Sequence, residues 1–182
     1  MAAQAFALFD SPIGTCGIAW NATGIAGFHL PLPSADGTRT RLQQRWSGAV
    51  ESPPPAGVQR VIDRVLALLN GEAIDLTDIP VDLADAPEFH RKVYEVARTI
   101  PPGRTMTYGE IAKRLGAPHE SREVGQALGR NPVAIIVPCH RVLGANGKMG
   151  GFSASGGVAT KRRILEIEGA AALSAGPLFD RR

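Results

Sequence analysis

The sequence predicts an α+β protein: a small N-terminal antiparallel-sheet domain followed by a mainly helical C-terminal domain with a helix-turn-helix. Two patterns support this prediction. Short apolar runs separated by turn residues fill positions 1–30, whereas apolar residues at helical spacing dominate positions 88–169. The 182 residues are 44% hydrophobic and 20% charged, which is enough apolar material for a real core and excludes a disordered chain.

Three strands are expected at the start of the chain. Residues 6–9 lead into the turn signal at 10–14, and residues 16–20 lead into a second turn at 21–24. Residues 25–30 then close an antiparallel meander.

The segment between the strands and the second half contains one predicted helix. Residues 31–57 hold Pro31, Pro33 and a run of three prolines, so we expect them to be largely loop, with Trp46 packed on whatever covers the sheet. Residues 58–69 place their apolar side chains on one helical face, and Asn70-Gly71 is a C-cap signal.

Prolines bound the segment at residues 80–87, and this pattern predicts a linker. We therefore divide the chain into a sheet-containing domain at 1–85, a second domain at 86–169 and a tail at 170–182.

The second domain reads as a series of short helices. A helix beginning near Phe89 should stop at Pro101-Pro102-Gly103. Thr107 and Glu110 form a capping box that opens a helix ended by Gly116, and Ser121 can cap a further helix from 122 to 129. Two short helices around a tight turn match a helix-turn-helix, although an ordinary helical hairpin has the same spacing.

The charge is divided unevenly between the two domains. Residues 1–85 carry five Arg and nine acidic residues, net −4, whereas residues 86–182 carry fifteen basic and eight acidic residues, net +7, which sums to the overall +3. A basic half favours a polyanion as partner, and a solvated surface of mixed charge is the alternative.

Two cysteines, Cys16 and Cys139, cannot build a disulfide scaffold, and no His or Cys spacing fits a metal site. The first residues lack a secretory signal, and no run approaches the ~20 apolar residues of a membrane helix. We expect a cytoplasmic monomer without membrane attachment, cofactor or metal.

The stretch at residues 135–142 is the most informative for chemistry. A β-branched apolar run, expected to be a buried strand-like segment, ends at Pro138 and is followed by Cys139 and His140. A thiol held there can face a cavity, with the imidazole able to take its proton. A buried structural cysteine fits the same pattern, and Cys16, which has no nearby base, is expected to be structural.

The string Pro138-Cys139-His140-Arg141-Val142, preceded by Asn131-Pro132, resembles the active-site segment of the O6-alkylguanine-DNA alkyltransferases, also called methylated-DNA–protein-cysteine methyltransferases. The resemblance is close over residues 88–169 and looser before them. Further matching pieces occur in the family's order: Thr107-Tyr108-Gly109-Glu110, Arg122, Gly125, Gly129-Arg130, Gly156-Gly157, Lys161 and residues 164–169.

This resemblance implies DNA repair by direct transfer. Cys139 would take the alkyl group from O6-alkylguanine as a stable thioether, so each molecule would act once; whether O4-alkylthymine is also a substrate stays open. His140 matches the base that acts through a water, and Glu168 the carboxylate that orients it. Glu166 lies on the opposite side of the same predicted helix, so only one of the two can serve.

The remaining site residues also follow from the resemblance. Tyr108 matches a tyrosine that donates a hydrogen bond to the departing base, and Asn131 a side chain that braces the active-site loop. Val142 and Ser153 match positions whose main-chain groups read the guanine edge. Phe152 stands where many members have Tyr, so a phenol is missing from the pocket wall, and Ser153-Ala154-Ser155 makes the following segment about two residues longer than in the shortest members.

In this family the second helix of the helix-turn-helix enters the minor groove and the damaged nucleotide is flipped out. Arg122 falls on the arginine that fills the gap, and Gly125 and Ala127 are small enough for close approach to DNA. Ser121 and Arg130 belong to the same predicted DNA-binding surface.

Three other functions compete with this prediction. A non-catalytic binder of alkylated DNA would have the same architecture but no need of Cys139. A Cys-His-Glu thiol hydrolase or redox enzyme would have no need of a basic half. A helix-turn-helix regulator would read sequence in the major groove, whereas a lesion scanner should bind with little sequence preference.

Overall fold

The structure, a computed structural model, describes residues 2–170, so residues 171–182 of the predicted tail lie outside the described part of the chain. A four-stranded sheet forms the N-terminal region, in the order β3-β2-β1-β4. The neighbours β1 to β3 pair antiparallel, which confirms the predicted meander, and β4 pairs parallel to β1. The strands are β1 (Ala5–Ser11), β2 (Gly14–Trp20), β3 (Ile25–His29) and β4 (Val50–Glu51).

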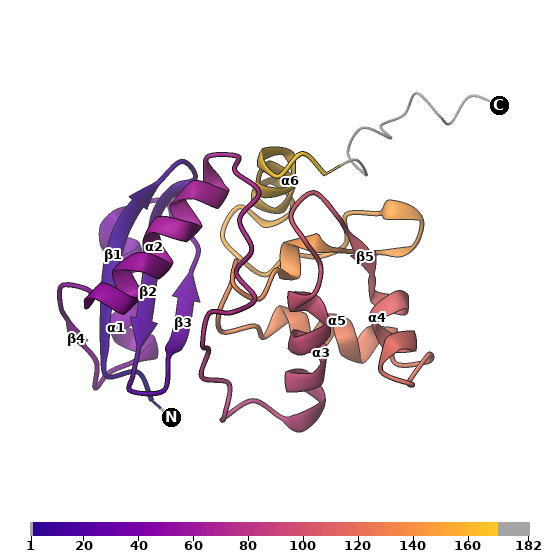
Figure 1. Cartoon of the computed structure of the whole chain (residues 1–182), viewed down its shortest axis with the longest axis horizontal. Helices are drawn as coiled ribbons and strands as arrows, with labels where there is room; N and C mark the ends of the chain where they lie inside the picture. Colours follow the sequence, from indigo (N-terminus) through magenta and orange to yellow (C-terminus); the bar gives the residue numbers. More distant parts are fainter. Residues whose placement is uncertain (1, 171–182) are drawn as a thin grey trace.

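One helix covers each face of this sheet, α1 (Ala35–Arg45) and α2 (Ala56–Leu69) (Figure 1). Side chains alternate between the faces, as the two-residue period of a strand requires. Phe6 and Ala19 pack with Leu42 of α1, whereas Ala7 and Ile18 join the core beneath α2. The sheet is therefore buried on both sides.

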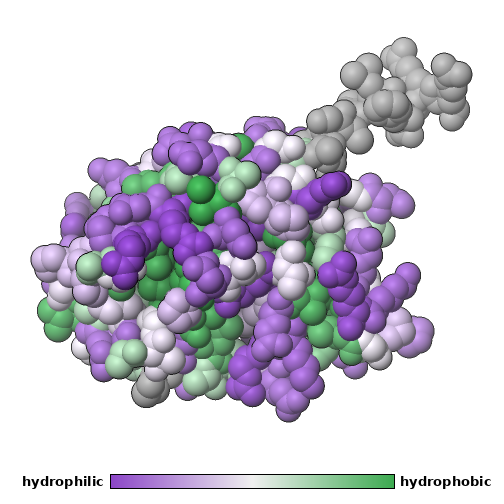
Figure 2. All heavy atoms as spheres, in the orientation of Figure 1, coloured by the Kyte–Doolittle hydropathy of each residue, from purple (hydrophilic) through white to green (hydrophobic). Residues whose placement is uncertain are grey.

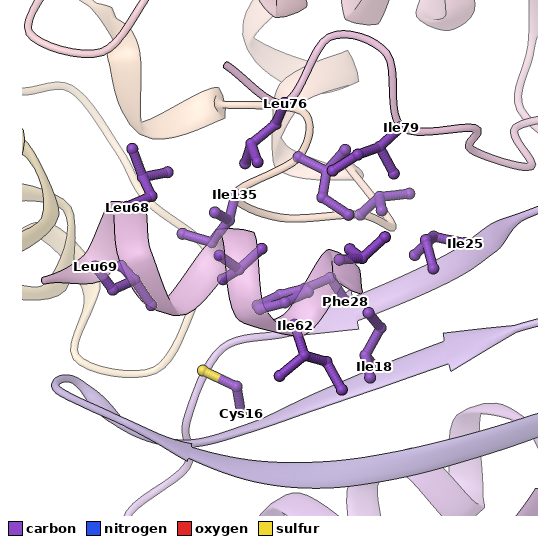
Figure 3. Close-up of a cluster of buried hydrophobic side chains, with 14 of the residues drawn as sticks. Cys16, Ile18, Ile25, Phe28, Ile62, Leu68, Leu69, Leu76, Ile79 and Ile135 are labelled. Carbon is purple, nitrogen blue, oxygen red and sulfur yellow. The ribbon is translucent and has the colours of Figure 1, made fainter. Parts of the chain in front are cut away.

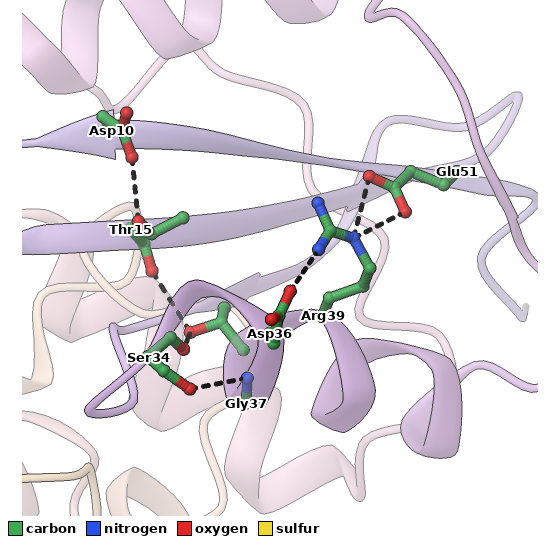
Figure 4. A network of polar contacts seen from close by, with 8 residues as sticks. Asp10, Thr15, Ser34, Asp36, Gly37, Arg39 and Glu51 are labelled. Atoms are coloured by element: carbon green, nitrogen blue, oxygen red, sulfur yellow. Dashed lines mark hydrogen bonds and ion pairs between the residues drawn. The ribbon is translucent and has the colours of Figure 1, made fainter.

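Helix α1 corrects the expectation that residues 31–57 are largely loop. Ser34 caps this helix by accepting a hydrogen bond from the Gly37 amide at 3.0 Å (Figure 4). The prolines at 31 and 33 precede the helix instead of interrupting it, so they do not oppose it. Trp46 ends α1 and lies against β3, since a Cβ on Gly27 would come within 2.0 Å of the Trp46 ring. The predicted packing of Trp46 is confirmed.

Helix α2 matches the prediction within two residues and ends at the predicted cap, with Gly71 at φ 96°. Its buried side chains form the main core with the sheet (Figure 3). This core also takes in Val133, Ile135, Ile136 and Ile164 from beyond the predicted domain boundary. The N-terminal sheet therefore packs directly on the segment that leads to Cys139.

The second half consists of short helices around a separate apolar cluster. A two-stranded parallel sheet, β5 with β6, adds a small amount of β structure. The elements are α3 (Glu88–Arg98), β5 (Met106–Thr107), α4 (Tyr108–Arg114), α5 (Ser121–Gly129), the 3₁₀ turns η1 (Cys139–Arg141) and η2 (Ala145–Gly147), β6 (Val142–Leu143) and α6 (Gly157–Ile167).

The predicted pair of short helices is present as α4 and α5. The capping box of α4 is complete: the Glu110 amide donates to Thr107 Oγ1 at 3.1 Å, and the Thr107 amide donates to Glu110 Oε2 at 2.6 Å. Ser121 does not cap α5, because the first turn closes one residue earlier through the hydrogen bond from the Val124 amide to the Glu120 carbonyl. Ser121 is instead the first helical residue.

The apolar run before Cys139 is buried as predicted, but it is not a strand. Ile135 adopts φ 69°, and the Val137 amide donates to the Val133 carbonyl at 2.9 Å, so the chain reverses. Left-handed backbone is unusual for a β-branched residue and occurs where surrounding contacts enforce it. Burial of the Ile135 and Ile136 side chains in the main core holds the turn in place.

The β3 edge of the sheet anchors this turn. The Phe28 amide donates to the Pro132 carbonyl at 2.9 Å, and Phe28 pairs with Val133 in an isolated bridge.

On the face drawn in Figure 2, hydrophilic residues predominate and hydrophobic ones show only in patches between them. None of the helices within residues 2–170 is long and apolar enough to cross a membrane.

Candidate functional site

Cys139 follows the buried turn at the start of η1, and Asn131 braces that turn from inside. The Asn131 side chain accepts from the Val133 amide at 2.9 Å and donates to the Val137 carbonyl at 2.8 Å. The Cys139 amide donates to the same Val137 carbonyl at 2.8 Å. A single amide side chain thus ties both ends of the turn together and fixes where Cys139 emerges.

The Cys139 residue is partly exposed and lines two cavities. The larger, about 570 Å³, opens between α4, α5 and residues 151–153, and its size is in the usual range for small-molecule sites. The smaller, about 240 Å³, opens toward α1 and β3. By contrast, Cys16 is fully buried in the main core, as predicted.

A buried carboxylate organises the residues next to Cys139. Glu168 Oε1 lies 2.8 Å from His140 Nε2 and 2.8 Å from Arg141 Nη2, and Arg141 Nε donates to Oε2 at 2.9 Å. The Glu168 side chain is 0% exposed and that of His140 1%. Arg141 Nη1 also donates to the Ile100 carbonyl at 2.6 Å. Glu166 is exposed on the same helix, so the structure brings only Glu168 to His140.

These contacts set the protonation state of the imidazole. Burial favours the neutral acid at Glu168, but the bonds from His140 and Arg141 outweigh it and lower its pKa to about 2. Burial lowers the pKa of His140, so the ring is neutral near pH 7. An ionised carboxylate can only accept, so His140 Nε2 carries the proton and Nδ1 keeps a free lone pair. The imidazole is therefore able to accept a proton.

Burial raises the pKa of the Cys139 thiol. A hydrogen bond from Asn131 and the positive charge of Lys161 act in the opposite direction and favour the thiolate. The resting protein therefore holds a thiol whose ionisation depends on its neighbours.

Lys161 is a further residue of the site. The sequence shows it only as one of the positions that match the family and predicts no role for it. Its side chain is fully buried, Nζ donates to the Val142 carbonyl at 2.6 Å, and it lies 5.8 Å from the Tyr108 ring centre and 6.0 Å from that of Phe152. Burial lowers the pKa of Lys161 to about 8. A signal existed in the sequence: position 161 falls on the apolar face of its helix with Ile164 and Leu165, where a solvated lysine does not belong.

Most of the predicted pocket and DNA-binding residues meet at the larger cavity. Phe152 and Ser153 also line the smaller cavity, and Ser153 Oγ donates to the Gly129 carbonyl at 3.1 Å. Arg130 lines the smaller cavity, not the larger one. The predicted residues around the larger cavity are Tyr108, Ser121, Arg122, Gly125, Cys139, Phe152 and Ser153.

Two predicted residues lie elsewhere. Ala127 is fully buried on the inner side of α5, where its carbonyl accepts from the Tyr94 hydroxyl at 2.8 Å, so the prediction that it approaches DNA is wrong. The helical period points it away from the surface that carries Arg122. Val142 is also fully buried: its amide donates to the Cys139 carbonyl, and its own carbonyl accepts from Lys161, which leaves one lone pair of that oxygen for a further donor.

Comparison with known proteins gives one consistent answer. Residues 88–170 match the family model described as 6-O-methylguanine DNA methyltransferase, DNA binding domain. A Mycobacterium tuberculosis protein named methylated-DNA–protein-cysteine methyltransferase is 38% identical over 94% of this chain and 96% of its own length. A namesake from Methanosarcina acetivorans is 38% identical over 90% of this chain and 97% of its own.

Solved structures agree with the sequence relatives. The crystal structure of Mycobacterium tuberculosis OGT in complex with DNA has a TM-score of 0.73 at 36% identity, covering 93% of this chain and 97% of that one. The O6-methylguanine-DNA methyltransferase of Pyrococcus kodakaraensis has a TM-score of 0.71 at 26% identity, covering 91% and 99%.

The replacement Lys161→Met should raise the pKa of Cys139, because it removes a buried positive charge that favours the thiolate. The rate at which Cys139 reacts with iodoacetamide between pH 6 and pH 8 reports the thiolate fraction while Lys161, with its pKa of about 8, is still charged. This rate should fall in Lys161→Met. Lys148→Met, at an exposed position, is the matched control and should leave the rate in place. A rate unchanged or raised in Lys161→Met would show that the lysine does not act on the thiol.

Proposed function

Because the chain belongs to the methylated-DNA–protein-cysteine methyltransferase family, we propose that it repairs O6-alkylguanine in DNA by moving the alkyl group onto Cys139. The protein binds DNA and repairs it by direct alkyl transfer to one of its own cysteines. The assignment of that cysteine rests on one observation: Cys139 lines the cavity beside α5. Cys16 is sealed in the core, and burial raises its pKa to about 12.

The larger cavity receives the guanine, and His140 activates the thiol. His140 Nδ1, left free by the bond from Nε2 to Glu168, takes the thiol proton through a water. The thiolate attacks the alkyl carbon in line with its bond to O6. The bond from sulfur to carbon forms while the bond from carbon to oxygen breaks, and the electron pair stays on the guanine.

Tyr108 supplies the hydrogen bond that the departing base needs. Burial raises the pKa of its phenol, so the group stays neutral and can donate at working pH. The Phe152 ring forms a wall of the same cavity without a donor. The main-chain groups of Ser153, which lines this cavity, read the guanine edge.

The product is a thioether, which does not hydrolyse, so each molecule repairs one lesion and is spent. No cofactor or metal takes part in this scheme. Since a thiolate must form for each transfer, the reducing cytoplasm is the compartment that suits the chemistry.

DNA reaches Cys139 from the side of α5. Ser121, Arg122 and Gly125 line the larger cavity, and Arg122 is exposed at the start of the helix. We place α5 in the minor groove, with the damaged nucleotide flipped into the cavity and the Arg122 guanidinium in the space it leaves. Arg130 contacts the phosphate backbone of the DNA nearby. One protein monomer repairs one lesion.

Replacing Cys139 with Ser should abolish transfer and leave binding to alkylated duplex intact, because a hydroxyl is far harder to ionise than a thiol. Loss of methyl from an O6-methylguanine duplex measures transfer, and a mobility-shift titration measures binding. Cys16→Ser is the control and should retain transfer. Transfer that persists in Cys139→Ser and disappears in Cys16→Ser would contradict the assignment.

The substitution Arg122→Ala should slow repair of a duplex by about tenfold. Flipping a nucleotide out of the stack costs a few kcal/mol, and without the Arg122 side chain nothing fills the gap that the nucleotide leaves. Transfer from free O6-methylguanine, which needs no flipping, should change little. Arg162→Ala, an exposed arginine on α6, should affect neither substrate. Equal losses on duplex and free base in Arg122→Ala would exclude the gap-filling role.

A further inference from the structure

The smaller cavity, on the far side of Cys139 from α4, has a strongly basic wall. Arg41 and Arg45 of α1 and Arg130 after α5 all line it. His29 at the end of β3 lines it as well, but burial and the charges of Arg41 and Arg45 lower the pKa of its imidazole, so it adds no positive charge near pH 7. No Asp or Glu is among the described residues that line it. It shares Leu128, Gly129, Cys139, Phe152 and Ser153 with the larger cavity, so Cys139 lies where the two meet.

Two arginines of this wall, Arg41 and Arg45, are free to bind an anion. Arg39, on the same helix, is paired with Asp36 at 2.8 Å and Glu51 at 3.0 Å (Figure 4). Among residues 2–170, Arg41 and Arg45 have no such carboxylate partner. Arg45 stacks on the Trp46 ring, 5.4 Å from its centre, which restrains its side chain.

The basic wall is also fixed relative to Cys139. Trp46 packs against Gly27 of β3, and the next residue of that strand, Phe28, is bonded to Pro132 at 2.9 Å. Pro132 itself lies between Asn131 and the turn that presents Cys139. The backbone that carries Arg41 and Arg45 is therefore fixed relative to the turn that presents Cys139.

We propose that the smaller cavity is a subsite for an anionic group at the free end of the alkyl adduct, a carboxylate in particular. This inference rests on the proposed function. Guanine fills the larger cavity, and the reacting carbon must lie between Sγ of Cys139 and O6. Because sulfur, carbon and O6 lie in line during the displacement, a substituent on that carbon projects sideways from this line. The smaller cavity adjoins the larger one along Cys139, Phe152 and Ser153, so a substituent directed there meets the arginines.

The reaction with such an adduct balances as it does for methyl. The Cys139 thiolate forms a bond to the CH₂ of an O6-carboxymethyl group, and the bond from CH₂ to O6 breaks with its electron pair left on guanine, which is then protonated. The product is S-carboxymethylcysteine, with its carboxylate retained in the basic cavity. Charge-assisted hydrogen bonds from Arg to a carboxylate are among the stronger polar contacts.

The test compares three otherwise identical duplexes, which carry O6-carboxymethylguanine, its neutral carbamoylmethyl analogue or O6-methylguanine. In the double variant Arg41→Gln/Arg45→Gln, single-turnover transfer of the carboxymethyl group should slow by about five- to tenfold, the scale of two partly exposed ion pairs. Transfer of the carbamoylmethyl and methyl groups should be unchanged. Arg39→Gln, a paired arginine on the same helix, should alter none of the three.

Two results would overturn the subsite. Equal slowing on all three duplexes, with no effect on the free bases, would mean that these arginines bind a DNA phosphate. Unchanged carboxymethyl transfer in the double variant would mean that they bind no anion of the substrate at all. Methyl transfer by the parent protein is the internal reference: its absence would contradict the proposed function, whereas its presence with either result above would contradict the subsite alone.

Discussion

The buried carboxylate of Glu168 is the interaction on which the site depends. An ionised side chain without exposure to water is tolerated only when partners satisfy it, and here His140 and Arg141 do so. Because Glu168 caps the end of α6 and Arg141 also bonds the Ile100 carbonyl, the same group holds α6, η1 and the segment after α3 together. It also decides which imidazole nitrogen is protonated, so one contact serves both packing and chemistry.

The N-terminal sheet has a positioning role in this arrangement. Its β3 edge pairs with the chain at Val133, and its main core buries Ile135 in a backbone conformation that such a residue avoids in isolation. The turn that presents Cys139 is therefore held from two sides, by the sheet and by Asn131. The strain of the turn is offset by burial in a core that belongs mainly to the other half of the chain. The same half supplies α1, whose arginines face the smaller cavity.

The sequence predicted best those features that depend on residues close together in the chain. The capping box at Thr107 and Glu110 depends on residues three apart, and it forms as predicted. Helix α1 was missed because the prolines at 31 and 33 were weighed as breakers, although Ser34 after them is a good cap. The turn at Ile135 could not be foreseen, since a short apolar run signals burial but does not distinguish a strand from a buried reversal. The inward position of Ala127 follows from the period of its helix, and Lys161 falls on the apolar face of α6, so the sequence held a signal for both. The groups that Lys161 contacts there are fixed only by tertiary packing.

The central claim is that one ionisable thiol, held beside a neutral imidazole, accepts the alkyl group and keeps it. Peptide mass mapping after incubation with an excess of O6-methylguanine duplex tests this most directly. We predict a single gain of about 14 Da, the mass that a transferred methyl adds to a thiol, on the peptide that contains Cys139. Repaired DNA together with unmodified protein, or the same gain on the Cys16 peptide, would contradict the account.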